Sequence, residues 1–252
     1  AIENNPVGGI YYSAQNFEDE QQAKELISKS QSYAKTAMFI TVCDEGGDNS
    51  PLASRFNSTT TDNVYNKSGD AVVKDYSSAL ALNLTKYGVN LNLAPNANIE
   101  GEYIFSTSEK SAGELAVSSA VGFSTKNVIS AIKHFPVQND SSKNLDELRA
   151  SELTTFASTI SAGADAIMMS NAKVAAIEDA PSYLSQRTVT ELLIKEMRFN
   201  GVVISASMAD VTVMAECASY SMTPASVLCA NGAEKNVASA EYASSKGMVD
   251  VV

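Results

Sequence analysis

The feature that most constrains the fold is a repeated alternation of short apolar segments with amphipathic helical patterns along 252 residues. This alternation is typical of β/α units arranged around a parallel sheet. The length matches one β/α barrel, so we predict a single α/β domain, residues 1–252, with a TIM-type β/α barrel. The predicted strands are 9–12, 38–42, 89–94, 128–135, 166–169 and 202–205.

Two of the helices between these strands are predicted from apolar residues at helical spacing. The first, 18–34, should bury one face that includes Tyr33. The second spans 144–160, and Asn144 followed by Glu147 resembles a capping box at its start. Both are expected to pack as outer-layer helices of the barrel.

A third helix is predicted to start at an N-cap, Ser185, and to end at Gly201. Residues 49–70 are rich in Ser, Thr, Asn and Asp, which favours a long surface loop. After residue 210 the pattern decays into small residues, so no final strand is predicted there. The first strand of the barrel is also missing, and we expect the resulting open edge to be covered by a second chain, the tail or further residues.

Composition excludes several classes of function. The net charge of -11 repels nucleic acid and anionic lipid, and no apolar run reaches the length needed to insert into a membrane. Cys43, Cys217 and Cys229 show no metal-binding spacing, so no metal or other cofactor is expected. The chain begins without Met and without a signal-peptide pattern, which fits a mature form or a fragment and leaves the compartment open.

Short motifs follow one another at the predicted strand ends. They are Gly8-Gly9-Ile10, Asp44-Glu45-Gly46-Gly47, Leu93-Ala94-Pro95, Lys133-His134-Phe135-Pro136 and the run from Ala162 to Ser170. In order and spacing they resemble the family 3 glycoside hydrolases over residues 8–208, and the Lys-His-Phe-Pro run is the most specific. The resemblance implies a bacterial extracytoplasmic β/α barrel that cleaves β-glucosides or N-acetyl-β-hexosaminides through a covalent glycosyl-enzyme.

That reaction needs a carboxylate nucleophile and a proton donor about 5 to 5.5 Å apart. By the resemblance, Ala206 occupies the nucleophile position, and the donor histidine of the N-acetylhexosaminide branch is absent because His134 is the only histidine. We therefore expect a glycosidase-like domain without hydrolytic activity, which serves as a binding or scaffold domain.

The resemblance also implies sugar-binding positions at several strand ends. They are Cys43, where the family has aspartate; Tyr103, where it has arginine; Asn171, where it has histidine; and the retained Lys133 and His134. A charged site has thus become largely neutral. The expected partner is a carbohydrate or a protein, and a homodimer is an open alternative.

An active retaining exo-β-glycosidase remains the alternative, with Asp210 or Asp140 as an unrecognised carboxylate. Asp44 and Glu45 are adjacent on a strand end and should point to opposite sides, so we expect a structural turn there rather than an acid/base pair. A serine nucleophile is disfavoured, because no nucleophile-elbow motif surrounds Ser205.

Overall fold

The computed structural model describes residues 7–47, 50–52 and 63–206. Its centre is a six-stranded, fully parallel sheet in the order β1-β2-β3-β4-β5-β8. These strands are β1 (Gly9–Tyr11), β2 (Phe39–Val42), β3 (Leu91–Asn92), β4 (Ile129–Phe135), β5 (Ala166–Met169) and β8 (Val202–Ile204). Neighbouring strands follow one another along the chain, as in a β/α barrel, and the predicted fold class is confirmed as an incomplete barrel of this type.

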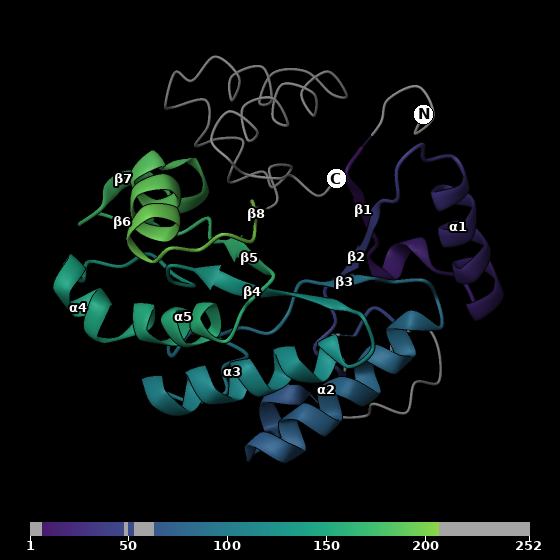
Figure 1. Ribbon diagram of the computed structural model, residues 1–252, viewed down its shortest axis with the longest axis horizontal. Helices are drawn as coiled ribbons and strands as arrows, with labels where there is room; N and C mark the ends of the chain where they lie inside the picture. The colour runs from purple at the N-terminus through teal and green to yellow at the C-terminus, as the bar shows by residue number, and fades with distance from the viewer. Residues whose placement is uncertain (1–6, 48–49, 53–62, 207–252) are drawn as a thin grey trace.

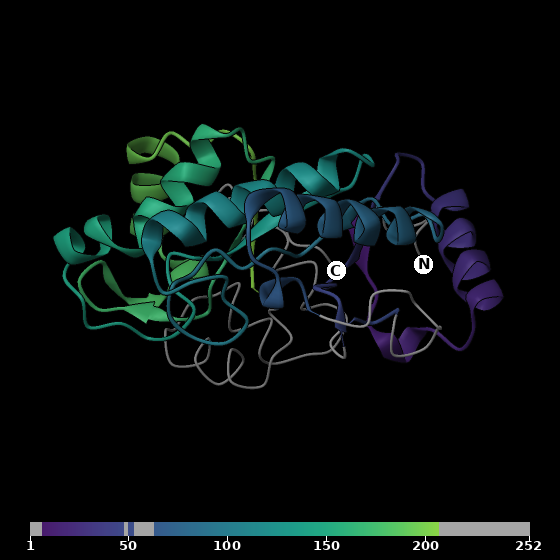
Figure 2. The same ribbon diagram turned by 90° about the horizontal axis from the view of Figure 1, so that it is seen from below.

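Helices connect the strands and cover one side of the sheet. They are α1 (Glu20–Ser32), α2 (Asp70–Thr85), α3 (Glu109–Ser124), α4 (Leu145–Ala150), α5 (Glu152–Ser161) and a π-helix, η5 (Arg187–Glu196). Helices α2, α3 and α5 lie side by side beneath the sheet (Figures 1 and 2). The remaining elements are the 3-10 helices η1 (Ala14–Asn16), η3 (Val64–Asn66) and η4 (Ser182–Leu184) and a small antiparallel pair, β6 (Lys173–Val174) and β7 (Glu178–Pro181).

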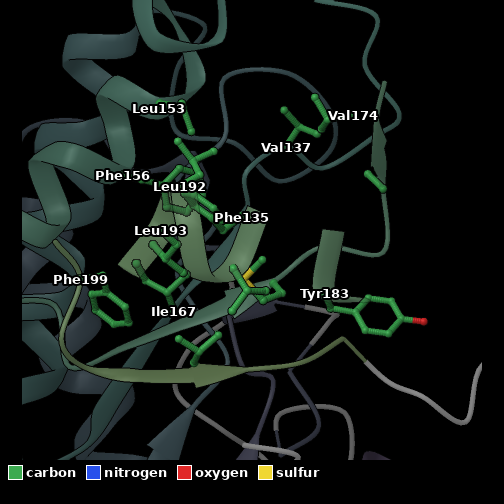
Figure 3. Packing of buried hydrophobic residues seen from close by; sticks show 14 of the residues in the cluster. Phe135, Val137, Leu153, Phe156, Ile167, Val174, Tyr183, Leu192, Leu193 and Phe199 are labelled. Carbon is green, nitrogen blue, oxygen red and sulfur yellow. The ribbon is translucent and has the colours of Figure 1, made fainter. Parts of the chain in front are cut away.

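The larger hydrophobic core lies between the β4–β5–β8 half of the sheet and the helices α5 and η5 (Figure 3). The rings of Phe135 on β4 and Phe156 on α5 meet edge to face, with their centroids 5.1 Å apart. Leu192 and Leu193 of η5 pack into the same cluster. This core fixes the position of β4, the strand that carries Lys133.

Most of the predicted strands agree with the structure within one or two residues, and β5 agrees at both ends. The capping box of Asn144 and Glu147 is confirmed, since the Asn144 side chain accepts from the Glu147 N–H and the Glu147 carboxylate accepts from the Asn144 N–H. The predicted helix 144–160 is instead two helices, because the backbone breaks at Ser151. Tyr33 is exposed rather than buried. Helix α1 ends at Ser32, and the residues that it buries are Ala23, Ile27 and Ser30.

The prediction that Gly201 ends the third helix is wrong. Helix η5 ends at Glu196, and the residue in the left-handed conformation after it is Arg198, with φ 58°. Gly201 is needed for a different reason: a Cβ there would collide with the Asp165 carbonyl oxygen, where β8 enters the sheet beside β5. Ser185 does cap the start of this helix through its side chain, as predicted, because Ser185 Oγ accepts a hydrogen bond from Thr188 N–H at 3.0 Å.

Within the described residues, the sheet is open at its two outer strands, β1 and β8. That a second chain, the tail or further residues cover the open edge stays a prediction. None of the described helices has the length and apolar character to cross a membrane. Half of the predicted loop at 49–70 lies outside the described residues, and the other half includes η3 and the first residue of α2, Asp70. The tail after 210 lies wholly outside them.

Candidate functional site at the carboxyl ends of the strands

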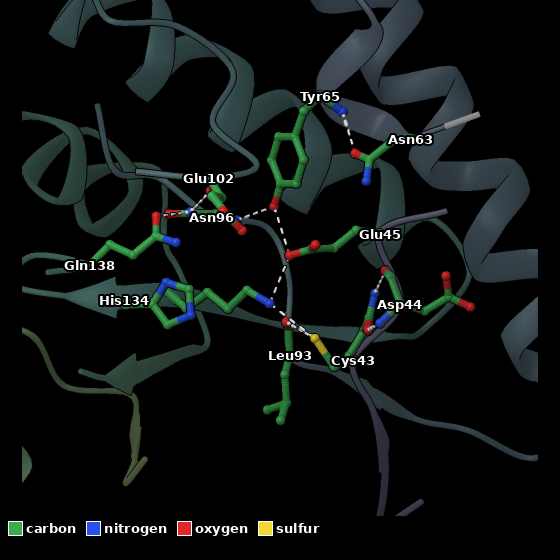
Figure 4. A network of polar contacts seen from close by, with 12 residues as sticks. Cys43, Asp44, Glu45, Asn63, Tyr65, Leu93, Asn96, Glu102, His134 and Gln138 are labelled. Carbon is green, nitrogen blue, oxygen red and sulfur yellow. Dashed lines mark hydrogen bonds and ion pairs between the residues drawn. The ribbon is translucent and has the colours of Figure 1, made fainter. Parts of the chain in front are cut away.

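The carboxyl ends of parallel strands meet at one edge of the sheet, and this edge carries the active sites of β/α barrels. Here it gathers Cys43 and Glu45 from the end of β2, Asn96 from the segment after β3, and Lys133 from β4 (Figure 4). Tyr65 of η3 reaches the same place. Hydrogen bonds and one ion pair join these five residues into one network, in which Asn96 takes part through its backbone N–H and the other four through their side chains.

An ion pair lies at the centre of the network. Lys133 Nζ is 2.7 Å from Glu45 Oε1, and both side chains are nearly inaccessible, with 6% and 8% of their surface exposed. Burial lowers the pKa of the Lys133 ammonium, but the Glu45 carboxylate, together with Cys43 when that thiol is ionised, outweighs burial and raises it. Lys133 therefore remains a fixed cation throughout the physiological pH range.

Cys43 is the second partner of this ammonium, since Lys133 Nζ lies 3.0 Å from Cys43 Sγ. The thiol donates to the Leu93 carbonyl at 3.4 Å. Burial raises the pKa of Cys43, with Lys133 opposing the increase. The resting group is consequently a neutral thiol, and Glu45 supplies the negative charge that balances Lys133.

Tyr65 anchors the Glu45 carboxylate from the other side. Its hydroxyl donates to Glu45 Oε1 at 3.0 Å and accepts from the Asn96 N–H at 2.5 Å. Burial and the neighbouring Glu45 hold the pKa of the Tyr65 phenol well above its ordinary value, so it acts as a hydrogen-bond donor. The rings of Tyr65 and Phe105 meet edge to face, with their centroids 4.7 Å apart.

The Gly46–Gly47 turn directs Asp44 and Glu45 to separate partners, as predicted from their adjacent positions. Both glycines have positive φ, 77° and 63°, which a side chain would disfavour. The Asp44 carboxylate accepts from Gly46 N–H at 2.9 Å and from Ser50 Oγ at 2.7 Å. Burial raises the pKa of Asp44 to about 6.

His134 is held by its backbone. The side-chain amide of Asn98 donates to the His134 carbonyl at 3.1 Å and accepts from the His134 N–H at 2.8 Å. Burial, and then the charge of Lys133, lower the pKa of the imidazole to about 3, so it is neutral at pH 7. Its Nδ1 is buried without a hydrogen-bond partner among the described residues. The Lys133–His134 peptide bond is cis.

The other sequence-derived candidates are less closely connected. Tyr103 is 46% exposed and approaches the network only through its ring, 6.4 Å from that of Tyr65. Asn171 is exposed just after β5. Ala206 is buried after β8, and Asp210 lies outside the described residues. Asp140 accepts from the Lys173 N–H at 2.7 Å, which places its carboxylate in a structural contact with β6.

The residues that sequence reasoning missed are Tyr65, Asn96, Asn98 and Gln138. Asn96 Nδ2 donates to Gln138 Oε1 at 2.8 Å and to the Glu102 carbonyl at 3.1 Å. A signal for the asparagines was present, because Asn occurs at every second position in 90–92 and 96–98 after an apolar run. Tyr65 gave none, since it lies within the polar segment 49–70 that was assigned to a loop.

The arrangement offers a fixed ammonium, an ionised carboxylate, a neutral imidazole and several amides at one edge. Such a mixture suits hydrogen bonding to a polyhydroxylated ligand. Among the described residues there is no group of three or more His, Cys, Asp or Glu side chains that could hold a metal ion.

Comparison with known proteins extends this picture. The model of the glycosyl hydrolase family 3 N-terminal domain matches residues 1–230. A beta-hexosaminidase from Stenotrophomonas maltophilia strain K279a is 27% identical over 81% of this chain and 68% of its own length. Beta-hexosaminidase A from Pseudoalteromonas piscicida is 25% identical over 80% of this chain, which spans only 41% of that relative.

Solved structures show the same fold. A family 3 beta-N-acetylglucosaminidase from Paenibacillus sp. str. FPU-7 superimposes with a TM-score of 0.83 at 20% identity, over 100% of this chain and 50% of that one. Native NagZ from Neisseria gonorrhoeae gives a TM-score of 0.78 at 20% identity, over 98% and 74% of the two chains.

Proposed function

Because this chain belongs to glycosyl hydrolase family 3, we propose that it binds a terminal β-linked sugar at the carboxyl ends of β2, β3 and β4 without hydrolysing the glycosidic bond. The proposal depends on a difference between the end of β4, which keeps a charged side chain, and the end of β8, which has none at the expected nucleophile position. The Lys133–Glu45 pair is present and buried, and Glu45 also accepts a hydrogen bond from Tyr65. Ala206 occupies the position after β8 where the family resemblance expects the nucleophile.

A methyl side chain cannot attack an anomeric carbon, so a covalent glycosyl-enzyme cannot form at Ala206. The neighbouring acid/base candidates do not compensate. His134 is neutral at pH 7, and its Nδ1 is buried. Glu45 is committed to Lys133 and Tyr65.

Two observations support a class of ligand: the activity named for the relatives, and the hydrogen-bond donors at the site. The curated relatives are beta-hexosaminidases, which supports an N-acetylhexosamine as the bound sugar. The Lys133 ammonium directs two of its three protons at Glu45 and Cys43, which leaves one donor for a ring hydroxyl. Because the site carries one buried cation balanced by one carboxylate, a neutral sugar is favoured over a charged one.

Binding is tested by calorimetric titration of the chain with the methyl β-glycosides of N-acetylglucosamine and glucose. The proposal expects saturable binding that Lys133→Met weakens at least tenfold, whereas Lys143→Met, which removes a lysine paired with Glu100 and Glu152 elsewhere, leaves binding unchanged. No binding of either glycoside to a folded chain would contradict the proposal.

A working glycosidase is the second candidate, because all the curated relatives named above are hydrolases. It requires a carboxylate that the resemblance does not place, and Asp140 and Asp210 are the two to test. Under this reading, Asp140→Asn or Asp210→Asn abolishes a turnover that the unmodified chain shows. The contact of Asp140 with the Lys173 N–H argues for a structural role at that position.

A further inference from the structure

The contact between Cys43 and Lys133 places a thiol against a lysine ammonium in a nearly closed environment. Sγ and Nζ are 3.0 Å apart, and Lys133 exposes only 6% of its side chain. Cys43 is partly accessible, and it is the only cysteine among the described residues. Oxidation can join a cysteine sulfur to a lysine nitrogen by a covalent S–N bond, and here these two atoms are already in contact.

We propose that Cys43 and Lys133 are an oxidative modification site, at which hydrogen peroxide produces a sulfenamide bond between Cys43 Sγ and Lys133 Nζ. The proposal rests on the contact itself and holds whether or not the chain binds a sugar. It assigns this pair a chemistry of its own, separate from ligand recognition.

The reaction has two balanced steps. Peroxide first oxidises the thiol to a sulfenic acid and is itself reduced, so that one water is released. Glu45, 2.7 Å away, then takes one proton from the Lys133 ammonium and frees the nitrogen lone pair. The lone pair attacks sulfur, the S–N bond forms, and the S–O bond breaks. Of the ammonium's other two protons, one leaves with the departing oxygen as water and one stays on nitrogen.

The surroundings favour this outcome over the usual ones. No second thiol stands among the described residues to form a disulfide with Cys43. Peroxide attacks thiolate rather than thiol, and the Lys133 ammonium stabilises a thiolate at 3.0 Å. Burial raises the pKa of Cys43 and opposes this, so oxidation should be slower than that of an exposed thiol. Once the sulfenic acid exists, Lys133 Nζ is already in contact with the sulfur, whereas a second peroxide has to enter from solvent.

The link would change the site reversibly. Lys133 loses its charge and its ion pair with Glu45, so the cation that organises the network disappears. Two equivalents of an added thiol restore the starting groups, since they reduce the S–N bond to thiol and amine and are oxidised to a disulfide. The edge of the sheet would then exist in a reduced, charged form and an oxidised, neutral form.

The test treats the folded chain with hydrogen peroxide, quenches it, and maps tryptic peptides by tandem mass spectrometry with and without dithiothreitol. The same treatment is applied to Cys43→Ser, to Lys133→Arg, which keeps a cation that does not attack sulfur, and to a Cys217→Ser/Cys229→Ser double variant that leaves Cys43 as the sole thiol. Circular dichroism establishes that each variant is folded.

The proposal expects a peptide in which Cys43 and Lys133 are joined with the loss of two hydrogens, no cleavage after Lys133 in that fraction, and full reversal by dithiothreitol. The product should form in the double variant and be absent from Cys43→Ser and Lys133→Arg. Conversion of Cys43 to sulfinic or sulfonic acid with Lys133 unmodified would overturn the proposal. So would an intact Cys43 thiol under conditions that oxidise glutathione completely. Both results can be read on the unmodified chain alone.

Discussion

Replacing Asp44 with asparagine should remove a specific part of the pH dependence of stability. The Asp44 carboxyl is completely buried, with its oxygens accepting from Gly46 N–H and Ser50 Oγ. Burial raises its pKa from 3.8 to about 6. A raised folded-state pKa means that the folded protein binds the proton more tightly than the unfolded chain. The contribution to stability is therefore fully present below the unfolded value and is lost as pH rises through about 6.

The size of the effect follows from the shift. One pKa unit corresponds to about 1.4 kcal/mol, so ionising Asp44 costs the folded state about 3 kcal/mol in total. Most of this cost falls between pH 4 and pH 7, where it amounts to about 2 kcal/mol. Asparagine is of the same size, remains neutral and can still accept one of the two hydrogen bonds.

The assay is urea unfolding of the unmodified chain and of Asp44→Asn at a series of pH values from 4 to 8. Other carboxylates titrate in both proteins, so the informative quantity is the difference between their free energies of unfolding. The variant should gain about 2 kcal/mol relative to the unmodified chain between pH 4 and pH 7. Parallel curves across this range would refute the assignment of a raised pKa to Asp44.

Three further predictions concern stability and use the same unfolding measurement. Phe156→Ala removes a fully buried ring and should cost about 3 to 5 kcal/mol; a loss below about 1 kcal/mol would contradict the packing described. Asn98→Ala leaves the backbone N–H and carbonyl of His134 without their partners and should cost about 3 kcal/mol, whereas an unchanged midpoint would argue against this clamp. Tyr65→Phe should cost about 1 to 3 kcal/mol because a buried carboxylate loses a donor, while the exposed Tyr33→Phe serves as a control that changes nothing measurable.

The sheet was predictable from sequence because its strands are buried on both faces. Residues 166–169 are apolar throughout and appear as β5 with the predicted bounds. In contrast, α2 and α3 were not assigned, since they pack closely through small residues. A Cβ on Gly122 of α3 would collide with the Lys74 carbonyl of α2, and Ser77 and Ser119 share a hydrogen bond of 2.8 Å. Such a helix contact carries little hydrophobic periodicity.

The break between α4 and α5 was invisible to periodicity for a similar reason. Apolar spacing continues across Ser151, but polar contacts determine the backbone there. Ser151 Oγ donates to the Glu147 carbonyl at 2.7 Å and also to the carboxylate of Glu152, which is buried and paired with Lys143 at 2.6 Å. A buried ion pair of this kind depends on residues brought together by the fold.

The candidate site was predictable only in part. Cys43 and Lys133 were expected at strand ends from the family resemblance, and the structure places Lys133 Nζ 3.0 Å from Cys43 Sγ. Glu45 was expected only in a structural turn, whereas its carboxylate lies 2.7 Å from Lys133 Nζ at the centre of the network. The role of Tyr65 depends on a contact across 20 residues of sequence, since its hydroxyl donates to Glu45 Oε1. No local pattern encodes that contact, so it could be seen only in three dimensions.

The central claim is that the site lacks hydrolytic activity, and it is tested most directly by incubating the chain with an aryl β-glucoside and an aryl N-acetyl-β-glucosaminide. The Ala206→Asp variant is measured beside it, to show whether a restored nucleophile alone recovers turnover. The account predicts no release of the aryl group by the unmodified chain above the buffer rate. Release that scales with the concentration of the unmodified, purified chain would contradict it and would favour the active-glycosidase reading.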